Sequence, residues 1–373
     1  MEKKTLGMTK EQSAQLQGLA ILLMIHHHFF NDLSIYGESL SFWDPQWVVR
    51  FAWFGKICVG VFAFVSGYGM CKVLEQKKGS VIRPCLQQIL GLLLRYWAVL
   101  LLFMGLFFDL GRRTFVWKEF LRNFFCIETS YNGAFWYVQQ YVMMLLMLAL
   151  WESFLRFFET LRSKGWKVSS LGKGGGAQAV FFGCLILGGL VWLLLAIILP
   201  GPREALKSFL DLIRVAFVLI FFVGWLLAKA GVFEWLFSKL SKLATGVRVL
   251  LGVFLVALVM AVRMLLADSP AYARLDFLFV PVFIVGTLLL LGVMAPIASL
   301  LGGVGRLCAY LWLTHLFTYE LTKDWLLGLV NSHLLFWLLE LIPCFLVASA
   351  FLSVEHGVLK FWKVIFQKHT QTK

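Results

Sequence analysis

Charged residues are scarce in this chain of 373 residues: only 14% are Asp, Glu, Lys or Arg, whereas 60% are hydrophobic. A water-soluble domain carries roughly a quarter charged residues. The mean hydropathy of +0.83 points the same way. The composition therefore excludes an ordinary soluble protein and indicates a protein embedded in a lipid bilayer.

Cysteine is also sparse, and its seven residues are scattered without close pairs. An odd number without metal-type spacing favours neither a disulfide framework nor a zinc site. The loops are too short to hold a soluble domain of any size, so the chemistry has to be done by the membrane helices. We expect no metal site and no bound cofactor.

Long apolar runs are what the sequence has in place of charge. Ten of them approach the roughly 20 residues that a transmembrane helix needs. They lie near residues 14–31, 51–71, 86–108, 134–155, 178–199, 209–228, 247–266, 275–295, 305–322 and 333–354. The sequence therefore predicts an all-α polytopic bundle of about ten transmembrane helices, forming a single domain over 1–373 with short tails at about 1–13 and 355–373.

The basic residues divide unequally between the two sides of these spans. With alternating loops, 21 Lys and Arg residues fall on the side of the N-terminus and 10 on the other. Cytoplasmic loops are rich in Lys and Arg, so this predicts that both termini lie in the cytoplasm. The same bias explains the net charge of +14. Without a basic stripe interleaved with aromatics, we expect a lipid bilayer and no nucleic acid as partner.

The first span holds the densest polar residues. Gln17 and His28 are eleven positions apart, which places them on one helix face about 16 Å apart along the axis. His26, His27 and His28 point in different directions because successive helical residues differ by about 100°. They make a poor metal cluster; they either meet interfacial water or pair with Asp32, or one imidazole acts as a general base.

Other polar side chains lie inside later spans, where each needs a partner, a cavity or a role. Arg95 either pairs with Glu340 or a backbone carbonyl, or contacts an anion. His315 is either a satisfied core histidine or part of an active site. Asp211 and Arg214 are three residues apart on a helix and are expected to pair.

Several stretches resemble one family, the membrane acyltransferase 3 family. Residues 17–24 followed by His28 are similar to its first-helix motif, in which Arg or Lys precedes Gly and a His follows. Residues 59–68 resemble its second helix, which ends in Phe-Phe-x-x-Ser-Gly. Further matches are residues 134–138 (Ala-Phe-Trp-Tyr-Val), 222–229 (Phe-Val-Gly-Trp-Leu-Leu-Ala-Lys), and 302–306 with 310–315 (Tyr-Leu-Trp-Leu-Thr-His).

The resemblance implies a multi-pass enzyme of the bacterial cytoplasmic membrane. Such an enzyme takes an acyl group, usually acetyl, from cytosolic acyl-CoA and places it on a hydroxyl of an envelope glycan or a related lipid-linked acceptor. Carried over, His28 is the candidate catalytic residue, which activates the hydroxyl or orients the acyl carbonyl. The resemblance implies a cavity lined by Ser66, Trp136, Tyr137 and His315.

The sequence departs from the family where cations would hold the CoA phosphates. Gln17 stands at the Arg or Lys position of the first helix, and the Arg-x-x-Arg pair of the third helix falls on Gln88 and Gly91. A neutral amide cannot replace the Coulomb attraction of a cation for phosphate. The expected acyl-CoA site therefore comprises Gln17 and Gln88 with Arg83 and Arg95 as substitute cations.

Lys72, Lys77 and Lys78 could add electrostatic attraction for CoA. The same departure leaves open a second hypothesis: a relative that has lost acyl transfer and binds or transports a lipid-linked or glycan substrate. An unrelated transporter is a weaker alternative because no inverted repeat or pair of broken helices is visible in the sequence.

Overall fold

The structure is a computed structural model that describes residues 8–37, 39–77, 80–163, 214–267 and 275–371. In this part of the chain every regular element is a helix, and the β pairing found there is an isolated bridge between Ser41 and Ser332. The prediction of an all-helical protein is confirmed. The span expected at 178–199 and the expected Asp211–Arg214 pair lie outside the described residues.

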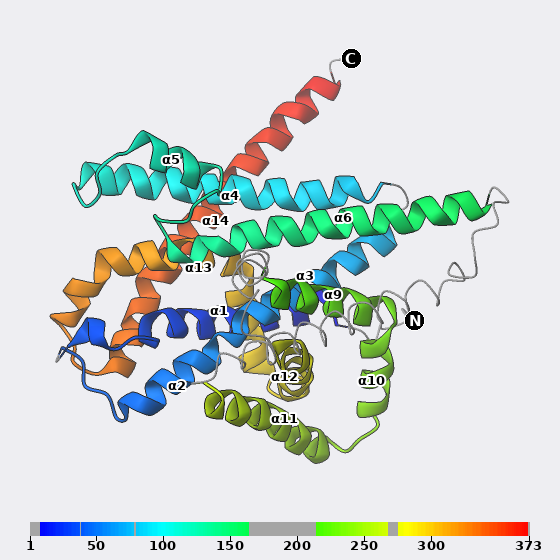
Figure 1. The fold of residues 1–373 in the computed structure, drawn as a ribbon, viewed down its shortest axis with the longest axis horizontal. Coiled ribbons are helices and arrows are strands. Elements are labelled where there is room, and N and C mark those ends of the chain that lie inside the picture. Colours follow the sequence, from blue (N-terminus) through cyan, green and yellow to red (C-terminus); the bar gives the residue numbers. More distant parts are fainter. Residues whose placement is uncertain (1–7, 38, 78–79, 164–213, 268–274, 372–373) are drawn as a thin grey trace, which may run out of the picture. The chain divides into compact units, whose positions relative to one another are not determined.

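The helices follow one another along the chain as Figure 1 shows. Their bounds are α1 Lys10–Phe30, η1 Ser34–Tyr36, α2 Pro45–Gly55, α3 Ile57–Gln76, α4 Ile82–Asp109, α5 Trp117–Phe124, η2 Gly133–Phe135, α6 Trp136–Ser163, α9 Val215–Lys229, α10 Val232–Leu240, α11 Thr245–Leu265, α12 Asp276–Leu291, α13 Ala295–Leu327 and α14 His333–Gln371.

Several helices are long and apolar enough to cross a membrane. The described residues contain six such spans, or seven if the bent pair α9 and α10, at 68° to each other, counts as one. The 21-residue α1 is not among the six; its glutamines and histidines lower its hydropathy. The protein is therefore a multi-pass membrane protein, while the count of ten spans and the cytoplasmic termini stay predictions.

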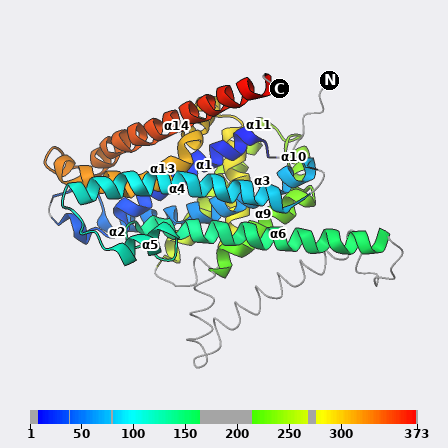
Figure 2. The ribbon, with the colours of Figure 1, turned by 90° about the horizontal axis from the view of Figure 1, so that it is seen from above.

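Four boundaries differ from the sequence prediction. The span expected at 51–71 lies within the longer candidate span Pro45–Gln76, in which α2 gives way to α3 at Lys56. The apolar helix α12 ends at Leu291, so it is shorter than the span expected at 275–295. Pro281 lies inside it, as expected. The helix α13 begins at Ala295 and not near 305. Finally, α14 continues to Gln371 through the expected tail from 355 (Figure 2), because hydropathy marks where a helix leaves lipid and not where its hydrogen bonding stops.

The described residues form two compact units. Unit 1 comprises Met1–Thr9, Val59–Leu93 and Tyr137–Leu290, and so holds most of α3, the start of α4, nearly all of α6, and α9 to α12. Unit 2 comprises Lys10–Cys58, Leu94–Trp136 and Leu291–Lys373, and so holds α1, α2, the rest of α4, α5, α13 and α14.

Glycine lets helices approach closely within each unit. In unit 2, a Cβ on Gly18 would overlap the Leu301 carbonyl oxygen, and one on Gly305 would overlap the Ala14 carbonyl oxygen. These two glycines bring α1 and α13 together along their length. Small residues at such crossings are the usual way for membrane helices to pack.

Candidate active site

The three consecutive histidines near the end of α1 have three different environments. The His27 Nδ1 lies 2.8 Å from the Ala52 carbonyl oxygen of α2. Because a carbonyl can only accept, His27 carries its proton on Nδ1 and ties α1 to α2. The His26 ring packs against Phe51 and Trp337, with centroids 5.0 and 5.7 Å away. The predicted divergence of the three side chains is confirmed.

The expected alternative partner of these histidines is engaged elsewhere. The Asp32 carboxylate accepts hydrogen bonds from the backbone N–H and hydroxyl of Ser34, at 3.0 and 2.7 Å. These hydrogen bonds hold the pKa of Asp32 below its usual range. The described residues contain no group of three or more His, Cys, Asp or Glu side chains arranged to hold a metal ion.

His28 meets His315 of α13. Their ring centroids are 5.1 Å apart and the rings are tilted by 50°. His28 is half-buried, whereas His315 has no exposed surface. Both histidines lie in unit 2, and the glycine contacts between α1 and α13 bring their helices close enough for the rings to touch. The structure thus brings two of the site residues that the sequence predicted into ring contact.

Hydrogen bonding fixes the tautomer of His315. Its Nδ1 lies 2.8 Å from the Trp312 carbonyl oxygen and 3.1 Å from that of Leu311. Both carbonyls can only accept, so Nδ1 carries the proton and a neutral ring keeps a lone pair on Nε2. This buried Nε2 has no hydrogen-bond partner among the described residues. His315 is thus a buried imidazole with one ring nitrogen hydrogen-bonded and the other open, and its expected active-site role stays a prediction.

The next turn of the same two helices is held by aromatic side chains. Phe29 stacks on Tyr319 with centroids 4.5 Å apart. The Tyr319 hydroxyl donates to that of Tyr36 at 2.8 Å, which donates to the Phe29 carbonyl oxygen at 2.7 Å. These contacts hold the His28 and His315 backbones in register.

The sequence indicated Glu340 of α14 only as a partner for Arg95 and not as a buried polar residue in its own right. This carboxyl group has no exposed surface, and its Oε1 lies 2.5 Å from the Thr322 hydroxyl. Its Oε2 has no hydrogen-bond partner among the residues that the structure describes. A single acidic residue inside an apolar helix was the available signal, because such residues are costly unless they have a partner or a role.

Arg95 pairs with Glu355 and not with the expected Glu340. Its Nε lies 3.1 Å from both Glu355 oxygens and its Nη2 lies 2.8 Å from Oε1. Its guanidinium also lies over the Tyr310 ring, 6.0 Å from the centroid. The prediction failed because Glu355 was assigned to a tail, whereas α14 carries it onward as a helix. The charge of Arg95 is therefore already compensated.

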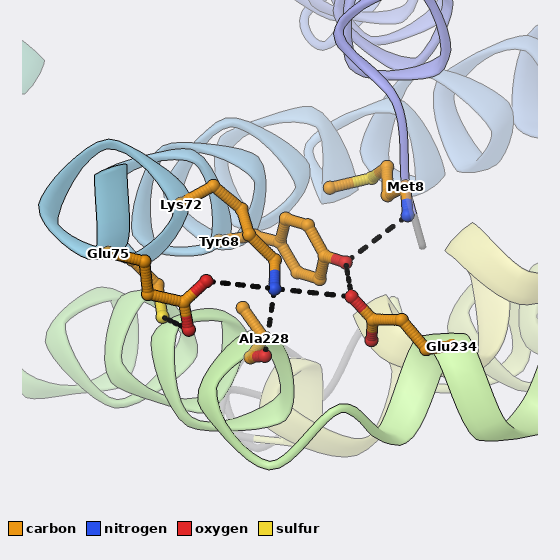
Figure 3. A network of polar contacts seen from close by, with 7 residues as sticks. Met8, Tyr68, Lys72, Glu75, Ala228 and Glu234 are labelled. Carbon is orange, nitrogen blue, oxygen red and sulfur yellow. Dashed lines mark hydrogen bonds and ion pairs between the residues drawn. The ribbon is translucent and has the colours of Figure 1, made fainter. Parts of the chain in front are cut away.

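Lys72, another expected source of attraction for CoA, is compensated in unit 1. Its Nζ lies 3.2 Å from a Glu75 oxygen, 3.2 Å from a Glu234 oxygen and 3.3 Å from the Ala228 carbonyl oxygen. The same Glu234 oxygen lies 3.3 Å from the Tyr68 hydroxyl (Figure 3). Two carboxylates surround one ammonium, so this cluster does not present a free positive charge.

The remaining expected site residues divide between the two units. Gln17 is half-buried on α1 and Trp136 is half-buried at the start of α6, both in unit 2. The others belong to unit 1: Ser66 is half-buried, Tyr137 is buried, and Arg83 and Gln88 are exposed on α4. Arg83 is the expected donor-site cation that forms no ion pair within the described part of the chain.

Comparison with known proteins agrees with the geometry. Residues 14–354 match the family model described as an acyltransferase domain, the acyltransferase 3 family. No curated protein and no solved structure matches the chain. The family match includes both α1, with His28, and α13, with His315. It covers nearly the whole chain, and the protein therefore belongs to the acyltransferase 3 family.

Proposed function

We propose that this protein is a membrane acyltransferase that moves an acyl group, acetyl in the simplest case, from cytosolic acyl-CoA to a hydroxyl of an envelope glycan or related acceptor. The observation that carries the proposal is the His28–His315 pair, built from α1 and α13 inside an acyltransferase family domain. The proposed location is the bacterial cytoplasmic membrane, with both termini inside.

The proposed chemistry needs one proton to move. His28 takes the proton of the acceptor hydroxyl while that oxygen bonds to the carbonyl carbon of the thioester. The carbon–sulfur bond then breaks and the CoA thiolate leaves with the proton from the His28 imidazolium. A neutral imidazole is suited to this role because its pKa in water lies near neutrality.

His315 supports this step as a positioning residue. Its Nδ1–H is held by the Trp312 carbonyl oxygen, so the ring cannot rotate without losing that bond. Its buried Nε2, which has no partner among the described residues, can then accept a hydrogen bond from a fixed position. An ordered acceptor beside the base reduces the orientational freedom that the reacting groups have to lose.

The expected acyl-CoA site has few uncompensated cations, and this supports a second hypothesis beside the enzyme. Gln17 and Gln88 are neutral, Arg95 is paired with Glu355, and Lys72 lies between two carboxylates. Arg83 is the cation that we propose for the CoA phosphates. The alternative is a relative that keeps the helices and binds or transports a glycan or lipid-linked substrate without acyl transfer.

Two measurements separate these functions: acetyl-CoA binding to the purified protein, and acetyl transfer in cells. We expect acetyl-CoA to bind, and labelled acetyl to move to envelope glycan in cells that carry the wild-type protein. The variant Arg83→Gln should weaken acetyl-CoA binding, with the exposed α10 residue Lys239→Gln as the matched control. A wild-type protein that binds no acetyl-CoA would exclude the enzyme and leave the binding or transport function.

A further inference from the structure

A polar cavity of about 440 Å³ lies in unit 2 beside the candidate active site. Its walls come from the turn after α4, the loop that leads into the start of η2, and α13. Among the side chains that line it are those of Arg112, Arg113, Tyr131, Glu320, Lys323 and Asp324. This volume lies within the usual range for small-molecule sites.

The cavity adjoins the histidine pair through α13. Leu316 and Phe317 of its wall directly follow His315, and Tyr319 lies one turn further along the same helix face, about 6 Å of axial rise away. Phe29, which stacks on Tyr319, directly follows His28. A molecule in the cavity would therefore lie against α13 within about one turn of His315.

Several polar groups of the cavity wall have unused hydrogen-bonding capacity. Tyr131 is 3% exposed, yet its hydroxyl has no hydrogen-bond partner among the described residues. The buried Nε of Arg113 is also without a partner there, although its Nη2 pairs with Glu320 at 2.9 Å. Buried polar groups usually have partners, so such groups on a cavity wall indicate a missing ligand or water.

The charge of the wall discriminates between possible ligands. Arg112, Arg113 and Lys323 face Glu320 and Asp324, so positive and negative side chains are nearly balanced. The net charge of the wall is therefore only +1, with two carboxylates among the three cations, so it does not offer the concentrated positive charge that would favour the several phosphates of CoA. A sugar hydroxyl both donates and accepts, so it suits a wall that offers ammonium, guanidinium, phenol and carboxylate groups together.

We propose that this cavity binds the sugar unit whose hydroxyl receives the acyl group, so that acceptor and CoA occupy separate places. This inference rests on the proposed function. Burial, aided by the nearby Glu119 carboxylate, raises the pKa of Tyr131, so its hydroxyl stays protonated and can donate to the sugar. Lys323 and Asp324 supply a second donor and an acceptor at the other side of the wall.

The test is direct sugar binding to the full-length protein in lipid nanodiscs. The probes are the methyl glycosides of glucose, galactose and N-acetylglucosamine, observed by saturation-transfer NMR and titrated for Kd. At least one should bind the wild-type protein. Tyr131→Phe and Lys323→Met should each weaken it about tenfold, the effect of one lost hydrogen bond to a charged or buried group.

Two features of these variants keep the test sharp. Tyr131→Phe removes a hydroxyl that has no hydrogen-bond partner among the residues that the structure describes, so the fold should not change. Lys118→Met is the matched control for Lys323→Met, because Lys118 is exposed on α5 and does not line the cavity. The proposal is overturned if none of the glycosides binds, or if both cavity variants keep the wild-type Kd.

A parallel transfer assay separates this inference from the proposed function. If the wild-type protein binds a sugar but transfers no acetyl from acetyl-CoA, the cavity stands and the acyltransferase function fails. If it transfers acetyl while both cavity variants keep the wild-type KM for the acceptor, the cavity fails and the function stands. The expected result is a raised acceptor KM with unchanged acetyl-CoA binding.

Discussion

The α1/α13 pair in unit 2 and the α11/α12 pair in unit 1 use the same packing device for different ends. Gly18 and Gly305 allow α1 to contact α13, and Gly252 and Gly286 lie where α11 contacts α12. The polar groups that the two crossings enclose differ. The comparison therefore separates what close helix packing does from what the enclosed side chains do.

The buried charges of the α11/α12 pair neutralise each other. Arg263 and Asp276 are 1% and 2% exposed, and their side chains form an ion pair. Between α1 and α13, by contrast, His315 keeps an Nε2 without a partner in the described part of the chain. A closed ion pair has both charges compensated, whereas the His315 lone pair stays able to accept a hydrogen bond, as the proposed positioning role needs.

Breaking the ion pair should give the largest effect on stability. Asp276→Ala leaves Arg263 charged and buried without its counterion, which costs about 3–5 kcal/mol. Unfolding by SDS, followed by circular dichroism, measures this loss. The double variant Arg263→Met with Asp276→Leu should recover most of it. An Asp276→Ala protein as stable as the wild type would contradict a structural role for the pair.

Removing His28 should instead abolish turnover and spare the fold. A general base contributes about 100-fold or more, so His28→Ala should lower acetyl transfer at least that much. The stability in SDS should stay close to that of the wild type. His356→Ala is the matched control, because His356 is exposed on α14. Undiminished transfer by His28→Ala would remove His28 from the mechanism.

A methyl group at each glycine crossing tests whether packing alone matters. Gly305→Ala pushes a Cβ into the Ala14 backbone, which cannot yield easily, and should cost about 1–3 kcal/mol as well as turnover. At Gly252 a Cβ would lie 2.9 Å from Leu290 Cγ and 3.0 Å from the Gly286 carbonyl oxygen, a much smaller overlap than that with the Ala14 carbonyl oxygen at Gly305. Gly252→Ala should therefore cost less stability and leave turnover unchanged. Equal loss of turnover in both variants would show that the α1/α13 crossing is not special.

The smallest effect is expected at Lys72, whose cluster is closed like the α11/α12 pair. About a third of its side chain is exposed, and so is about a third of that of Glu234, so Lys72→Met should cost about 1 kcal/mol or less. Acetyl-CoA affinity, measured by calorimetry, should stay within about twofold because two carboxylates already compensate the ammonium. A tenfold weaker affinity would instead place Lys72 at the donor site.

Much of the helical layout followed from hydropathy alone. The runs at 86–108 and 247–266 correspond closely to α4 and α11. Prediction was poorer where apolar character and helix length diverge: α2 and α3 meet at Lys56, and α14 extends far beyond its apolar part. Backbone hydrogen bonding decides where a helix ends, and a polar environment does not interrupt it.

The site was predicted in part. The periodicity of α1 indicated that its three histidines diverge, and the resemblance selected His28. Local sequence patterns could not predict which charged side chains pair, because partners such as Arg95 and Glu355 are separated by 260 residues. The role of His27 as a tie to α2 was hidden for the same reason, since it depends on a carbonyl oxygen of another helix.

The sequence by itself determined that the chain is helical, spans a membrane and belongs to one acyltransferase family. These properties follow from composition, the length of apolar runs and the order of motifs, all of which can be read along the chain. Only the tertiary structure decided which imidazole stands beside His28, which cations are already paired, and where a polar cavity opens next to them. The physical reason is that glycine contacts between distant helices set these distances, and hydrogen bonds across those contacts decide which groups stay open for chemistry.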